Sequence, residues 1–96
     1  HTQAMFVYGL MLSQASRACE AAPWMRRAAE AGLKSARIAY VDNVVGGRWA
    51  ECGMAFDVDA MASFLDAAGD QVSGYYENML LEALRRELAV LEGALP

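Results

Sequence analysis

The chain has few of the residues on which most enzyme active sites depend. Its 96 residues include one histidine, two cysteines and two prolines, and the histidine is the first residue. Histidine titrates near neutral pH and is the commonest general base, so no catalytic triad can be built here. The two cysteines lack the spacing of metal ligands. The two carboxylates of Asp57-Val58-Asp59 could bind Ca²⁺, but helix capping explains them more simply, because such a cation needs six or more oxygens. We therefore expect a non-enzymatic protein with no metal and no cofactor.

Long apolar runs and basic clusters are missing as well. The longest apolar run, Ala4 to Leu12, is about half the length that a bilayer span requires. Eight basic residues stand against twelve acidic ones, for a net charge of −4, and such a charge repels phosphate backbones and anionic lipid. The sequence therefore predicts no membrane insertion and no nucleic-acid partner.

The two cysteines, Cys19 and Cys52, are too few for a disulfide framework. We interpret them as reduced and buried, with a single disulfide as the alternative. Reduced cysteines favour a cytoplasmic protein of bacterial type, although a removed targeting segment stays possible because the chain does not begin with methionine.

The composition favours one small domain over residues 1–96 with more apolar surface than it can bury. Hydrophobic residues make up 56% of the chain and aromatic residues only 9%. A domain of this length buries about two thirds of its unfolded surface, so its core is marginal. An excess of apolar surface on such a domain indicates a homo-oligomer, and we expect a homodimer.

The first third of the chain gives mixed signals. Ala4 to Leu12 fits either a buried strand or the start of a helix, and we favour the strand. Ser13 is suited to cap a helix that runs through Ala22. Pro23 is suited to begin the next helix, and Gly32 to end it. This region is interpreted as two short helices or one kinked helix.

The centre of the chain predicts a β-hairpin. Segments 35–45 and 48–56 are rich in strand-forming residues, and Gly46-Gly47 between them suits a tight two-residue turn. Asp57 or Asp59 then caps a helix with Met61 and Leu65 on its apolar face. The expected fold class is α+β: a two- or three-stranded sheet with a central hairpin, packed on helices.

The last third predicts a long amphipathic helix from residue 70 to residue 96. Apolar side chains recur at spacings of three and four, and Gly93 and Pro96 are suited to end the helix. Because the apolar face is longer than the core of so small a domain needs, we expect it to form much of the dimer interface, through Leu80, Leu84, Leu88 and Leu91.

Aromatic and methionine side chains suggest a second kind of site. Methionine adapts its shape to varied ligands, so an apolar small-molecule pocket lined by these residues is one interpretation, and ordinary core packing is the other. The leading function is therefore a non-enzymatic module that binds an apolar small molecule or a partner protein. The candidate binding residues are Trp24, Trp49, Met54, Tyr75, Tyr76 and Met79.

One family resemblance gives an alternative. Val72-Ser73-Gly74, followed some twenty positions later by Leu88 to Gly93, is similar to the V-x-G and L-D-x-x-E-G segments of the γ-glutamylcyclotransferase-like family. Tyr8-Gly9 resembles the family's Y-G-[ST] substrate loop. The resemblance implies a cyclotransferase in which Glu92 is the general acid and base and Tyr8 and Gly9 hold the substrate. Leu10 and Ala89 depart from the motifs.

Overall fold

The computed structural model describes residues 1–53, 57–68, 75–91 and 93. These residues form five α-helices and one short 3₁₀ helix, and they contain no β-strand. The predicted α+β fold with its two- or three-stranded sheet is therefore wrong, and the described part of the protein is all-α. The elements are α1 (Thr2–Gln14), α2 (Ala18–Glu30), α3 (Lys34–Val45), η1 (Ala50–Cys52), α4 (Val58–Ala68) and α5 (Tyr75–Leu91).

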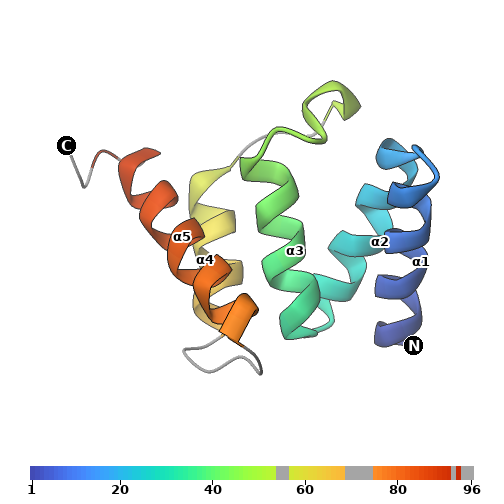
Figure 1. The fold of residues 1–96 in the computed structure, drawn as a ribbon, viewed down its shortest axis with the longest axis horizontal. Helices are drawn as coiled ribbons and strands as arrows, with labels where there is room; N and C mark the ends of the chain where they lie inside the picture. The colour runs from blue at the N-terminus through green and yellow to red at the C-terminus, as the bar shows by residue number, and fades with distance from the viewer. Residues whose placement is uncertain (54–56, 69–74, 92, 94–96) are drawn as a thin grey trace.

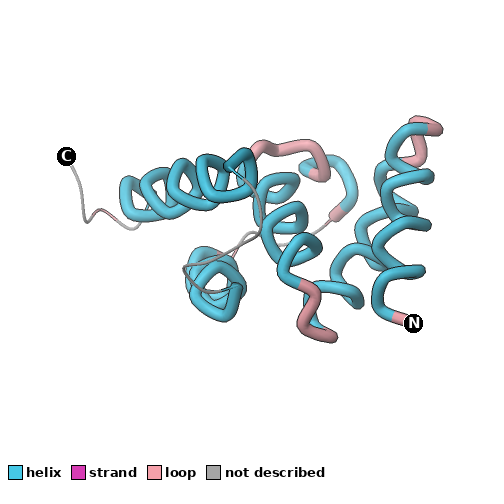
Figure 2. The backbone as a smooth tube through the Cα atoms, turned by 60° about the horizontal axis from the view of Figure 1, so that its bottom comes forward, coloured by secondary structure: helices cyan, strands magenta, loops and turns pink. Residues whose placement is uncertain are grey.

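The helices follow one another in a row (Figure 1). Helix α1 lies at one end, α2 and α3 come next, and α4 and α5 pack together at the other end. Helix α3 contacts α2, α4 and α5, so it is the centre of the array. The turned view in Figure 2 shows α4 nearly along its axis, with α5 running across it. None of the described helices has the length and apolar character that a bilayer span requires.

The central position of α3 explains why its sequence was mistaken for a strand. Ala36, Ile38, Tyr40 and Val41 are all buried, because neighbouring helices cover α3 on more than one side. A helix buried on several sides shows no single apolar face. Its buried residues at 36, 38 and 40 imitate the alternation of a strand, so the sequence signal and the structure disagree there.

Gly46 and Gly47 end α3 and do not turn a hairpin. The N–H of Arg48 donates to the carbonyl of Asn43 at 3.0 Å, and the N–H of Gly47 donates to that of Val44 at 3.2 Å. Gly47 has a φ of +75°, which is the left-handed conformation that this helix-ending motif requires. The same pair of hydrogen bonds ends α2 at Gly32, where φ is +103°. The prediction that Gly32 ends a helix is confirmed.

The first third of the chain is a pair of antiparallel helices. Ala4 to Leu12 lies inside α1, so the preferred strand is wrong, and Ser13 also belongs to α1 instead of capping the next helix. Pro23 lies inside α2, which is continuous through it. The two helices approach closely at Gly9, where an added Cβ would lie 2.7 Å from Cγ of the buried Met25.

The expected start of α4 and the apolar face of α5 agree with the structure. Oδ1 of Asp57 accepts hydrogen bonds from the N–H groups of Asp59 and Ala60 at 3.0 and 3.3 Å, as a helix cap does. Helix α5 is shorter than predicted within the described residues, and Gly93 follows its end with a φ of +77°. Residues 69–74, 92 and 94–96 of the predicted helix lie outside the description.

The apolar face of α5 packs into the core of its own chain. Leu84 and Leu88, which we expected in a dimer interface, are 2% and 3% exposed, and Leu80 packs partly buried against the same core. Of the four predicted interface residues, Leu91 alone is largely exposed. The face is therefore used within the chain, which leaves little of it for a second copy.

The cysteines form a disulfide, so their interpretation as reduced and buried thiols is wrong. Cys19 in the first turn of α2 is bonded to Cys52 at the end of η1, with their Cα atoms 5.2 Å apart. Cys19 is exposed and Cys52 half-buried. The bond joins the N-terminal helix pair to the segment after α3. The sequence pattern had placed Cys19 in a helix and Cys52 in a strand of the predicted hairpin.

Candidate functional site

The predicted binding residues do not gather in one pocket. Trp24 is half-buried, with its ring edge-on to Tyr8 at 5.1 Å and under the guanidinium of Arg27. Trp49 is buried against Tyr40 in the core, and Met79 is exposed on α5. Met54 and the side chains of Tyr75 and Tyr76 lie outside the described part. For Trp49, ordinary packing is therefore the better interpretation.

The alternative catalytic set stays a prediction. Tyr8 and Gly9 lie within α1, with Tyr8 exposed and Gly9 buried against α2. Glu92 is outside the described residues. No distance therefore joins the three groups that a cyclotransferase would need.

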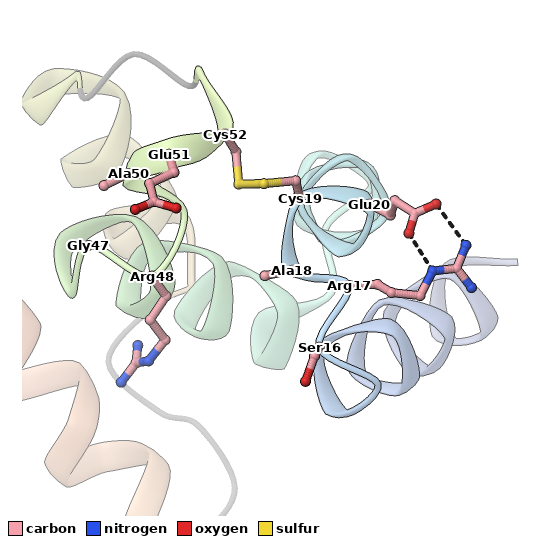
Figure 3. A pocket seen from close by; sticks show the side chains of 10 residues that line it. All are labelled: Ser16, Arg17, Ala18, Cys19, Glu20, Gly47, Arg48, Ala50, Glu51 and Cys52. Atoms are coloured by element: carbon pink, nitrogen blue, oxygen red, sulfur yellow. Dashed lines mark hydrogen bonds and ion pairs between the residues drawn. A yellow bond between two sulfur atoms is a disulfide. The ribbon is translucent and has the colours of Figure 1, made fainter.

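A cavity of about 590 Å³ lies beside the disulfide (Figure 3). The turn after α1 forms one side and residues 47–52 form the other. Three of the four charged side chains that line it already pair with protein groups: Arg17 and Glu20 with each other, and Arg48 with both the carbonyl and the carboxylate of Asp42. A ligand would have to break these exposed pairs, so size alone does not make this cavity the best candidate.

A groove along α2 is the better candidate. Three cavities of about 350, 390 and 440 Å³ share Arg26; the first is lined by α2 and Cys52, and the other two are lined also by residues of α3 and α4. We call this surface the Arg26 groove. Its walls and floor include Pro23, Arg26, Arg27 and Glu30 of α2, Arg37 and Tyr40 of α3, and Ala60, Ser63, Phe64 and Ala67 of α4.

Arg26 is held only weakly by its protein partner. Its Nε lies 3.7 Å from the carboxylate of Glu30, and both side chains are more than half exposed. An exposed pair at that distance contributes little to stability, about 0–1 kcal/mol. The guanidinium can therefore exchange Glu30 for a carboxylate on a ligand at small cost.

Arg37 offers a second, better-positioned cation at the end of the groove beyond Glu30. Its Nε donates to the carbonyl of Ala29 at 2.9 Å, which fixes the partly buried side chain against the last turn of α2. The ion pairs among the described residues do not include Arg37. Its two Nη groups are thus available for bidentate binding of a carboxylate, the geometry that arginine favours.

Aromatic and small apolar groups line the same cavities as the two cations. Phe64 packs edge-on against Tyr40, with ring centroids 5.3 Å apart, and Ala60 lies beside Phe64 in two of the three cavities. Burial raises the pKa of the Tyr40 hydroxyl above its usual value, while Arg26 acts in the opposite direction. Tyr40 therefore stays neutral at physiological pH and keeps a hydroxyl proton to donate.

We expect the raised pKa of Tyr40 to make the protein less stable in alkali. The neutral phenol is favoured in the folded state, so this contribution is fully present below pH 10 and is lost as the pH rises through the raised pKa. Melting temperatures measured from about pH 8 to about pH 11.5 should fall more steeply for the wild type than for Tyr40→Phe. Equal slopes in the two proteins would contradict this origin.

The sequence pattern did not predict the groove residues, although it contained one signal for them. Arg26 and Arg27 are adjacent basic residues on a helix, a pattern that usually marks only a solvated face. Arg37 and Phe64 carry no such signal, because their proximity to Arg26 depends on how α2, α3 and α4 pack. Among the described residues no group of three potential metal ligands comes together.

Comparison with protein-family models, curated proteins and solved structures gives no match to this chain.

Proposed function

We propose that this protein is a non-enzymatic binding module whose Arg26 groove holds a short segment of a partner protein. The segment carries a carboxylate next to apolar side chains. The observation that carries the proposal is the position of Arg26, which is shared by all three cavities and is more than half exposed. Arg37 adds a fixed guanidinium, and Phe64 and Ala60 supply apolar surface in the same cavity.

The shape of the groove supports a peptide more than an apolar small molecule. Cys19 and Glu30 on α2 mark its length, and a helical separation of about eleven residues spans about 16 Å. An extended peptide of about five residues covers that distance. The cavities are open to solvent and contain arginines, whereas small-molecule sites are enclosed and mostly apolar.

The charge of the groove supports an acidic segment. The whole chain has a net charge of −4, yet Arg26, Arg27 and Arg37 line the groove against Glu30 and Asp57. The groove is thus locally cationic on an acidic protein. Such a contrast favours binding of carboxylates there and disfavours basic peptides through repulsion.

Selection from a random peptide library displayed on phage tests the proposal. We expect enrichment of peptides with Asp or Glu beside Leu, Ile or Phe, and roughly a tenfold or greater loss of affinity for them in Arg26→Glu, because a charge-assisted contact is lost and repulsion replaces it. Fluorescence anisotropy of a selected peptide gives the dissociation constants.

Arg86→Glu is the matched control. Arg86 is exposed on α5 and is not among the residues that line the groove, and the substitution changes the net charge by the same amount. We expect Arg86→Glu to bind within about twofold of the wild type. Selection of basic peptides, or equal losses in the two variants, would overturn the proposal.

The disulfide supports a location in an oxidising compartment, since such bonds persist there and are rare in the cytoplasm. The prediction of a cytoplasmic protein depended on reduced cysteines and loses that support. A fusion to a reporter that is active only after export would separate the two locations.

A further inference from the structure

The outer face of α1 is apolar and uncovered. Val7, Leu10 and Met11 are between 38% and 58% exposed, and Tyr8, whose ring also packs edge-on against Trp24 of α2, is 44% exposed. The inner side of the same helix packs on α2 through Gly9 and Leu12. A helix that is apolar all round is normally buried on both sides. The outer face of α1 therefore lacks the packing partner that is usual for a helix of this composition.

The two ends of the helical array differ in this respect. Figure 1 places α1 at one end and α5 at the other. Helix α5 exposes the apolar Met79, Val90 and Leu91, but it also exposes the charged Glu82, Arg86 and Glu87, which give it part of the polar outer surface that a terminal helix needs in a stacked array. Helix α1 has no charged side chain from Thr2 to Gln14, and it is the only described α-helix without one.

Charge indicates what can cover α1. Two copies of a chain with a net charge of −4 repel each other, and like charges in contact are costly. Among the described helices, only α1 lets two copies meet along a whole helix without bringing like charges together. A charged partner, in contrast, finds no opposite charge on this face.

We propose that two copies of the chain pair through α1, with the two helices antiparallel about a two-fold axis. In that arrangement Val7 of one copy lies opposite Met11 of the other, and Ala4 lies opposite the end of the partner helix near Gln14. At these two contacts the smaller Ala4 and Val7 face the larger Gln14 and Met11, which lets the two surfaces interlock. Antiparallel helix dipoles also attract each other.

The proposed dimer is weak because the contact is short. Thirteen residues of helix are about 20 Å long, so the buried area lies at the low end for specific interfaces, below about 1,200 Å² in total. We therefore expect the dimer to dissociate in the micromolar range. This pairing is independent of the Arg26 groove, since the two surfaces share no residue.

Sedimentation velocity across a concentration series tests the pairing. We expect the wild type to change from monomer to dimer, and Met11→Glu to raise the dissociation constant roughly tenfold or more while the helical circular dichroism stays unchanged. Met79→Glu is the matched control, because Met79 on α5 is 53% exposed and Met11 is 58% exposed. It should dimerise like the wild type.

A mixing experiment tests the orientation. Val7→Lys and Met11→Glu should each be monomeric alone and should form a heterodimer when mixed. An antiparallel pair brings position 7 of one chain opposite position 11 of the other, so the introduced ammonium and carboxylate meet across the interface, whereas a parallel pair keeps them apart. The proposal would be overturned if the wild type stayed monomeric at several hundred micromolar, or if Met11→Glu and Met79→Glu had equal effects. It would also be overturned if the mixture of the two variants stayed monomeric.

Discussion

Replacement of Leu84 by aspartate is expected to unfold the chain. Leu84 is 2% exposed and lies in the core cluster with Leu81 and Leu88 of α5 and with residues of α2, α3 and α4. A carboxylate there would be buried without a partner, at a cost of more than about 4 kcal/mol. Domains of this size have only about 5–15 kcal/mol of stability. Circular dichroism should show loss of helix, and no cooperative thermal transition should remain.

Leu91→Asp is the control for this prediction. Leu91 belongs to the same helix and is 53% exposed, so its replacement should shift the melting temperature by only a few degrees, the size expected of surface substitutions. A cooperative transition near the wild-type temperature in Leu84→Asp would mean that α5 does not pack on the core.

Removal of the disulfide is expected to have the second-largest effect. The bond between Cys19 and Cys52 spans 33 residues, and the loop-closure relation assigns about 3–4 kcal/mol to a loop of that length. The melting temperature of Cys19→Ala/Cys52→Ala should therefore fall by roughly 20 °C relative to the oxidised wild type. Differential scanning calorimetry provides this value.

Treatment with a reductant distinguishes the effect of losing the disulfide from the effect of replacing the two cysteine side chains. Dithiothreitol should lower the melting temperature of the wild type, because the exposed Cys19 is accessible to it, and should leave the double variant unchanged. Two free thiols in the denatured, unreduced wild type, measured with a thiol reagent, would show that the bond is absent.

Local signals in the sequence predicted helix ends better than they predicted the class of fold. Asp57 caps α4 and Gly32 ends α2, because capping depends on a few neighbouring residues. The central segment failed because α3 is buried on several sides, so that the period of its apolar residues reflects its neighbours and not its own conformation. Gly46-Gly47 suits a hairpin and a helix end equally well.

The candidate site was less predictable than the fold. Its cations come from α2 and α3 and its aromatic wall from α4, so only the packing of three helices brings them together. The contact between Cys19 and Cys52 has the same origin. Trp49 was selected for its residue type, but it is buried in the core, since a large apolar side chain serves a core and a pocket equally well.

The most direct test of the central claim is a nuclear magnetic resonance titration that follows the arginine Nε–H signals while a selected acidic peptide is added. We predict large shifts for Arg26 and Arg37 that saturate together, with Arg86 unchanged, because the peptide carboxylates bind in the Arg26 groove. The account would be contradicted if the signals of Arg26 and Arg37 did not move and the saturating shifts were confined to Arg17 and Arg48, beside the disulfide. Shifts confined to the amides of α1 would contradict it in the same way.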